Sequence, residues 1–243
     1  MPWDFWLIFA VLGILLPWRG RARLRKLLEQ PAMSGADRLA LYASTIIFQW
    51  FMVLITAWRA RARGLTWADM ALVQQGRLRV VIAAIVGAAT LGALQWFNLR
   101  RIGQSTGQAP SFLRRLAARL FPQSRTELAL YLLLALTAGF CEEFLYRGFT
   151  MAALARWGLP PWSVVLLSSV LFGLAHLYQG RGGFLSTLVI GTVFGTARIA
   201  YHALAPEMAW HAVFDAVAGI AGPKYLLRRE TAAEPEIPSF VEK

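Results

Sequence analysis

Residues 128–149 read LALYLLLALTAGFCEEFLYRGF, and this stretch decides what kind of fold the chain adopts. It carries no charge as far as Cys141, and the adjacent acids Glu142 and Glu143 follow immediately. An apolar run of this kind predicts a membrane helix whose polar neighbours face the protein interior. Carboxylates at membrane depth are costly and usually functional, so this helix is also the first candidate for a site.

The rest of the chain has the same character. Of its 243 residues, 57% are apolar and only 16% are charged, as is typical of a multispanning membrane protein. We therefore expect an all-α fold, a polytopic transmembrane bundle of about seven helices, within a range of six to eight. The uncharged stretches are residues 5–18, 39–58, 80–99, 128–141, 157–180 and 182–197, followed by a shorter one at 208–223 that Asp215 interrupts.

Two sections between these stretches are amphipathic and predict short helices along the lipid interface, namely residues 65–79 and 110–121. We divide the chain into an N-terminal membrane region (1–126), a membrane core with the chemically active motifs (127–226) and a polar tail (227–243). The first apolar segment lacks a basic leader and a small-residue cleavage site, so we expect it to be a retained anchor.

The formal net charge is +12, which would suit a nucleic-acid-binding protein. The arginines, however, lie between the apolar segments, so we expect no nucleic acid and assign them to topology and to anionic lipid. With seven helices, one side of the membrane receives about two thirds of the basic residues and the C-terminus, and that side is expected to face the cytosol. We expect an integral, multi-pass protein of a bacterial inner (plasma) membrane.

The first candidate motif is Glu142-Glu143-Phe-Leu-Tyr-Arg147. On a helix, Glu143 and Arg147 stand four residues apart and share a face, so their side chains can pair. Glu142 points about 100° away from that face. One glutamate is then neutralised structurally, and the other stays available for chemistry.

Two further motifs follow in apolar surroundings. In Phe172-Gly-Leu-Ala-His176 the same spacing puts an aromatic ring beside an imidazole, where it limits access of water. In His211-Ala-Val-Phe-Asp215, Asp215 is placed to accept a hydrogen bond from one nitrogen of His211 and to direct the other nitrogen into the site. A buried Glu–Arg pair or His–Asp pair often only joins helices, but titratable groups of both kinds in one half of the chain favour a functional site.

These motifs, in this order and within several hydrophobic helices, resemble the CPBP family of intramembrane proteases. That family includes the CAAX prenyl endopeptidases and bacterial proteins linked to bacteriocin processing and immunity, also called abortive-infection-like proteins. The resemblance covers residues 127–221, and Arg147-Gly148-Phe149 continues the first motif in the usual style.

The resemblance implies that Glu142 activates the attacking water as general base, helped by His176. Glu143 and Arg147 would orient that pair, and His211 and Asp215 would stabilise the oxyanion. The family has Asn or Asp at the last position, and an Asp can donate a hydrogen bond only when it is protonated. Orienting His211 is the safer role for Asp215.

A metal is the main open alternative in the mechanism. Glu142, His176 and His211 match a catalytic zinc shell of three protein ligands, whereas the sequence His-Glu-x-x-His is absent. We favour hydrolysis without a cofactor and keep zinc as possible. Cys141 is the single cysteine, so no intrachain disulfide forms, and we expect it to pack in the core.

The sequence leaves two classes of function open. The favoured one is an intramembrane endopeptidase that acts on a membrane-associated peptide or on a lipid-modified, possibly prenylated, protein. The alternative is a membrane protein without catalysis, either an immunity-type binder or a proton-coupled transporter. A geometric problem also remains, because simple up-and-down crossings place His176 and His211 at different depths. A bent or partly inserted helix must lie between them, and Gly180 and Gly182 would permit a tight turn.

Overall fold

The computed structural model describes residues 1–30, 32–73, 76–104 and 111–227, and within these ranges every regular element is a helix. The all-α prediction is confirmed. In chain order the elements are α1 (Trp3–Ala10), η1 (Val11–Leu15), α2 (Leu16–Glu29), α3 (Gly35–Ala62), α4 (Arg77–Gln104), α5 (Ser111–Leu120), α6 (Arg125–Glu143), η2 (Phe144–Thr150), α7 (Met151–Arg156), α8 (Pro161–Ala175), η3 (Leu177–Gln179), α9 (Gly180–Tyr201) and α10 (Ala205–Leu226).

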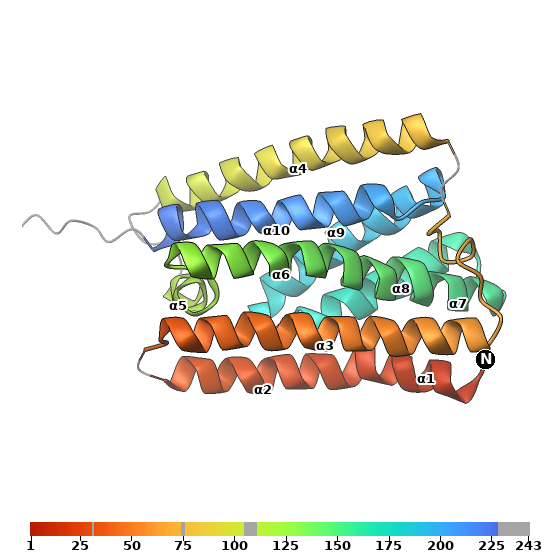
Figure 1. Cartoon of the computed structure of the whole chain (residues 1–243), viewed down its shortest axis with the longest axis horizontal. Coiled ribbons are helices and arrows are strands. Elements are labelled where there is room, and N and C mark those ends of the chain that lie inside the picture. The colour runs from red at the N-terminus through yellow and green to blue at the C-terminus, as the bar shows by residue number, and fades with distance from the viewer. Residues whose placement is uncertain (31, 74–75, 105–110, 228–243) are drawn as a thin grey trace, which may run out of the picture.

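The long helices lie side by side along one axis, and consecutive ones run in opposite directions (Figure 1). The π-helical turns η1 and η2 each join two α-helices into one continuous rod, Trp3–Glu29 and Arg125–Arg156. Helix α5 is the exception, because it is seen end-on and crosses one end of the bundle (Figure 1). We call this the α5 end.

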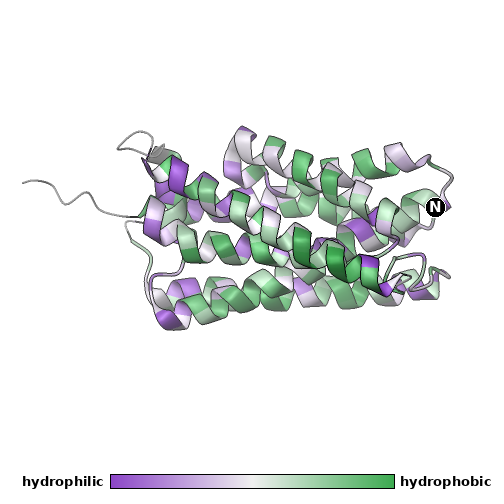
Figure 2. Ribbon diagram, turned by 90° about the horizontal axis from the view of Figure 1, so that it is seen from above, coloured by the Kyte–Doolittle hydropathy of each residue, from purple (hydrophilic) through white to green (hydrophobic). Residues whose placement is uncertain are grey.

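Five helical segments are long and apolar enough to cross a membrane, and we call each of them a rod. Four of them are Trp3–Glu29, α3, α4 and Arg125–Arg156, and the fifth is Leu177–Tyr201, which consists of η3 and α9. Hydrophobic residues cover the middle of the bundle, whereas hydrophilic residues gather toward its ends (Figure 2). The protein is an integral membrane protein with several crossings. The basic residues of α2 and α5 lie at the α5 end, which we expect to face the cytosol.

Helices α8 and α10 complete the bundle but differ from the five rods. Helix α8 has 15 residues and is therefore about 22 Å long, less than the roughly 30 Å hydrocarbon core of a bilayer. The chain turns back at η3 and Gly180, whose φ of 85° is a conformation that glycine adopts freely. This short helix, rather than a bend in α9, lets His176 lie at the depth of His211.

The prediction of two interfacial helices is confirmed for one of the two sections. Residues 111–120 form the amphipathic helix α5. Residues 65–72 form turns instead of a helix, and Arg77 already begins α4. Leu65 and Met70 of this turn segment are buried, and Ala71 accepts a hydrogen bond from the backbone of Leu204 (3.0 Å). The alternation of apolar and polar residues therefore marks a segment that packs inward against the start of α10.

Helices α6 and α10 approach closely at Gly139, which lies one turn before the two glutamates. A side chain carbon added at Gly139 would lie 2.7 Å from the backbone oxygen of Met208 and 2.8 Å from the backbone nitrogen of Ala212. Backbone atoms of a packed helix cannot yield at small cost. Glycine at this position therefore sets the distance between the helix that carries Glu142 and the helix that carries His211.

Gly139→Ala is expected to destabilise the protein by about 1–3 kcal/mol, because the added methyl group overpacks this contact. Thermal unfolding in detergent measures the loss. Gly182→Ala is the matched control, since nothing lies within 4 Å of a carbon added at this helical position. The control should leave stability unchanged or raise it slightly. Equal stability of the two variants would contradict the close approach of α6 and α10.

Candidate functional site

The candidate residues come from three parts of the bundle. Glu142 and Glu143 end α6, and Arg147 follows in the π-helical turn η2, a kind of turn that often occurs at functional sites. His176 is the residue directly after α8, and His211 lies in the second turn of α10. The structure brings all of them together, and Asp215 joins them from the next turn of α10.

The Glu142 carboxylate lies at the centre of this group. Its Oε2 atom is 3.9 Å from Nε2 of His176 and also 3.9 Å from Nε2 of His211. These distances are too long for direct hydrogen bonds and leave room for a water molecule between the carboxylate oxygen and an imidazole nitrogen. Oε2 has no hydrogen-bond partner among the described residues, and the Glu142 side chain is 19% exposed. The geometry thus holds an acceptor oxygen that faces two imidazole nitrogens.

Glu143 is fully buried and contacts two partners through one oxygen. Its Oε1 atom accepts a hydrogen bond from Nη1 of Arg147 (3.0 Å) and lies 2.8 Å from Nδ1 of His211. The predicted pairing of Glu143 with Arg147 is confirmed. Because a carboxylate accepts and Nδ1 must then donate, Glu143 fixes the tautomer of His211 and leaves Nε2 directed toward Glu142.

The structure places Asp215 beside His211 without the expected hydrogen bond, and its role in orienting the ring stays a prediction. Asp215 Oδ2 lies 3.6 Å from Nε2 of His211, outside hydrogen-bond distance, and its side chain is 35% exposed. The spacing of four residues does place the two side chains together. Glu143 takes the orienting position because α6 reaches His211 from the opposite side, on the Nδ1 edge of the ring.

His176 is held by its own helix. Its Nδ1 atom lies 2.9 Å from the backbone oxygen of Phe172, so Nδ1 carries a proton and Nε2 is free to face Glu142. The rings of Phe172 and His176 meet edge to face with centroids 4.7 Å apart, which confirms the predicted stripe. The Phe172 ring also covers the guanidinium of Arg147, 4.1 Å from its centroid. The Phe172 ring therefore lies between the Glu143–Arg147 ion pair and His176.

The residues fit a catalytic zinc ion poorly. Ligands about 2.0–2.1 Å from a tetrahedral zinc lie about 3.3 Å apart, whereas the Glu142 oxygen and each histidine nitrogen are 3.9 Å apart. In the described ranges, no three side chains of His, Cys, Asp or Glu are arranged to hold a metal ion. The separation favours a water molecule that binds by hydrogen bonds.

Two polar residues near the site escaped the sequence analysis. Gln49 of α3 donates a hydrogen bond from Nε2 to Oε1 of Glu142 (2.8 Å). Glu207, near the start of α10, is fully buried, and neither of its carboxylate oxygens has a partner among the described residues. The available signal was a polar side chain inside an apolar stretch, since Gln49 lies within residues 39–58. That signal alone does not reveal which helix the side chain faces.

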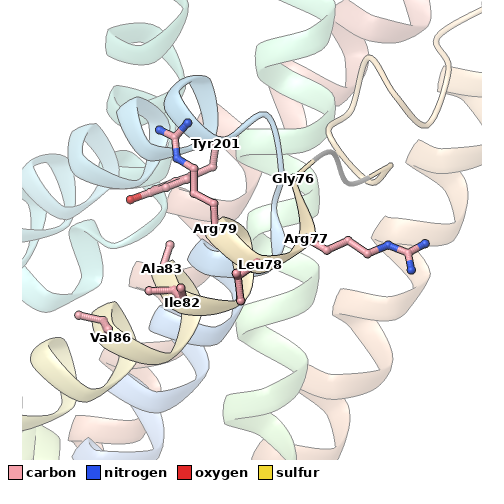
Figure 3. A pocket seen from close by; sticks show the side chains of 8 residues that line it. All are labelled: Gly76, Arg77, Leu78, Arg79, Ile82, Ala83, Val86 and Tyr201. Carbon is pink, nitrogen blue, oxygen red and sulfur yellow. The ribbon is translucent and has the colours of Figure 1, made fainter.

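A surface cavity of about 730 Å³ lies away from the site, between the start of α4 and the end of α9 (Figure 3). Apolar residues such as Ile82 and Val86 line its floor. Arg79 lies over the ring of Tyr201 (5.1 Å to its centroid), whereas Arg77 points away from both (Figure 3). The two arginines do not converge on one point, and none of the candidate site residues lines this cavity.

Comparison with known proteins agrees with the geometry. Residues 124–217 match the family described as type II CAAX prenyl endopeptidase Rce1-like. This range holds all six candidate residues and excludes Gln49. No match was found among curated proteins or among solved structures. The resemblance to the CPBP intramembrane proteases is confirmed for residues 124–217.

Proposed function

We propose that the chain hydrolyses a peptide bond with a water molecule activated by Glu142, a proposal that the match of residues 124–217 to the type II CAAX prenyl endopeptidase Rce1-like family supports. The observation that carries this proposal is the position of Glu142 Oε2 at 3.9 Å from both histidine Nε2 atoms. In the proposed mechanism, a water molecule bound to this oxygen is the one that Glu142 activates.

Glu142 acts as general base in this scheme. Its Oε2 atom takes one proton from the water, and the oxygen of that water attacks the carbonyl carbon of the scissile peptide. In the proposed scheme the ring of His176 is neutral with its proton on Nδ1, which bonds the Phe172 carbonyl, and Nε2 accepts a hydrogen bond from the second hydrogen of the water. Glu142 then gives its proton to the leaving amine nitrogen, so that the C–N bond breaks and the carboxylate is restored.

His211 supplies the charge that the tetrahedral intermediate needs. Glu143 contacts its Nδ1 atom, and Asp215 lies beside its Nε2 atom, so carboxylates flank the ring on both edges. Together they favour the doubly protonated ring, whose Nε2 proton can be donated to the developing oxyanion. Arg147 balances the charge of Glu143 and holds it in place. Asp215 acts on His211 and does not itself bind the oxyanion.

The proposed substrate is the C-terminal segment of a membrane-associated protein, and prenylated C-terminal segments are the first to test. This choice rests on the Rce1-like match, since CAAX motifs carry a prenyl group on their cysteine. A bacterial inner membrane is the proposed location. The other reading from the sequence, a binder or a transporter without catalysis, has no observation in the described residues that favours it.

The direct test is to incubate the purified protein in liposomes with C-terminal peptides, prenylated and unprenylated, and to identify products by mass spectrometry. We expect cleavage that continues within about twofold of its rate after treatment with a strong chelator and removal of the chelate, because water binds Glu142 by hydrogen bonds. Loss of cleavage that zinc restores would overturn the mechanism without metal. Absence of cleavage of every peptide would count against the proposed function itself.

A further inference from the structure

We propose that Gln49 is a positioning residue for Glu142, so that helix α3, outside the Rce1-like region, completes the active site. The inference rests on the function proposed above and deepens it. It concerns a residue that lies 93 positions before Glu142 in the sequence. The N-terminal half of the chain then contributes directly to catalysis and is more than a membrane anchor.

The contact itself is well defined. Gln49 Nε2 donates to Glu142 Oε1 at 2.8 Å, a distance typical of a hydrogen bond to a charged carboxylate. It is the single hydrogen bond that the Glu142 carboxylate makes to the described residues. Because the bond occupies Oε1, the other oxygen is the one that faces His176 and His211. The amide therefore determines which carboxylate oxygen is presented to the water.

Glu142 needs such a partner because no other side chain or backbone group of the described residues forms a hydrogen bond with its carboxyl group. The side chains of Glu143 and Arg147 are fully buried and paired with each other, whereas Glu142 is partly exposed and both histidines lie 3.9 Å from it. A glutamate has several accessible rotamers, and most of them would carry Oε2 away from the two nitrogens. Displacement of a reacting group by about 1 Å can reduce the rate about 100-fold.

Helix α3 is rigid enough to support this role. Trp50, the next residue, stacks on Phe140 of α6 with ring centroids 5.2 Å apart. Met52 and Val53 belong to the same buried cluster as Cys141 and Phe144, the residues directly before and directly after the two glutamates. The amide of Gln49 thus projects from a helix that is packed directly against the helix of Glu142.

Stability does not explain the presence of Gln49 at this position. Its own carbonyl oxygen Oε1 is buried and has no hydrogen-bond partner among the described residues. An unpaired buried carbonyl destabilises the folded state and offsets the stabilisation from the bond to Glu142, so an apolar side chain of the same length should be tolerated. A purely structural role of Gln49 predicts a lower midpoint of thermal unfolding for such a variant, whereas a positioning role predicts a lower kcat without that loss.

The test is Gln49→Met, which keeps the length of the side chain and removes the donor. In the liposome assay kcat should fall about 10-fold to 100-fold, while KM changes by less than about twofold, because substrate contacts are unaffected. The midpoint of thermal unfolding should stay the same or rise. Thr45→Val is the matched control, since Thr45 lies one turn earlier in α3 and its hydroxyl bonds the backbone oxygen of Leu41 in its own helix. The control should keep the kcat of the wild type.

The outcomes separate this inference from the proposed function. If Glu142→Gln is inactive but Gln49→Met keeps the kcat of the wild type, the positioning role is overturned and the protease remains. A lower unfolding midpoint for Gln49→Met, with kcat unchanged, would assign Gln49 a structural role instead. If Glu142→Gln still cleaves the peptides, or the wild type cleaves none, the proposed function fails and the inference fails with it. In the Glu142→Gln background, Gln49→Met should have no further effect on residual cleavage.

Discussion

Replacement of Glu142 by glutamine is expected to reduce kcat about 10²-fold to 10⁴-fold, which is the range that a general base contributes. Glutamine has nearly the shape of glutamate, but its side chain cannot take a proton from the water. Initial rates of peptide cleavage in liposomes measure the effect. KM should change little, because the Glu142 carboxylate acts on the water and makes no contact that binds the rest of the peptide.

The same variant should keep its fold. Glu142 is partly exposed and makes one hydrogen bond within the described part of the chain, so the midpoint of thermal unfolding should lie close to that of the wild type. This combination also separates the two classes of function. An immunity-type binder would bind its partner equally well with glutamine at this position, and no peptide would be cleaved by the wild type. A proton-coupled transporter would show pH-dependent flux across the liposome membrane in place of cleavage.

Arg147→Met is expected to produce the largest loss of stability, about 3–5 kcal/mol, because it removes one partner of a buried ion pair. Arg147 and Glu143 are both fully buried, and the guanidinium packs on the rings of Phe172 and Phe194. Methionine removes the guanidinium partner of the Glu143 carboxylate in the protein interior. Thermal unfolding in detergent, together with the yield of folded protein in the membrane, measures the loss.

Arg156→Met provides the control for the change of charge. Arg156 is exposed near the end of the same rod, and its Nη1 atom donates a hydrogen bond to the backbone oxygen of Gly64 (3.0 Å). Its replacement should cost less than about 1 kcal/mol, as for most surface positions. An Arg147→Met protein as stable as this control would show that Glu143 does not depend on Arg147 for its charge balance in the folded protein. The proposed role of Arg147 in holding Glu143 would then be refuted.

The sequence was sufficient for the architecture and for most of the candidate group. Apolar stretches bounded by arginines predict membrane helices because a bilayer leaves the backbone few alternatives. The spacing of four residues correctly placed Glu143 beside Arg147 and Phe172 beside His176, since both pairs lie on one helix face. Such pairs depend on local geometry alone, which a sequence contains.

Contacts between helices could not be predicted in the same way. His211 has two nitrogens, and the spacing to Asp215 does not say which of them a third helix will reach. Gln49 bonds Glu142 only because α3 packs against α6, and no periodicity in the sequence encodes that register. The end of α8 could not be predicted either, because the uncharged stretch of the sequence continues past His176 while the helix stops there. Tertiary packing decided each of these three features.

The position of Glu142 along α6 limits the shape of any substrate that enters from the α5 end. Glu142 lies in the last turn of α6, which begins at Arg125 at that end, so the carboxylate is about 25 Å inside the bundle. An extended chain advances about 3.3–3.6 Å per residue, so roughly seven residues are needed to cover this depth. A folded domain could not follow them between the helices. If the protein hydrolyses peptides as proposed, it should cleave flexible C-terminal tails and leave folded C-terminal ends intact.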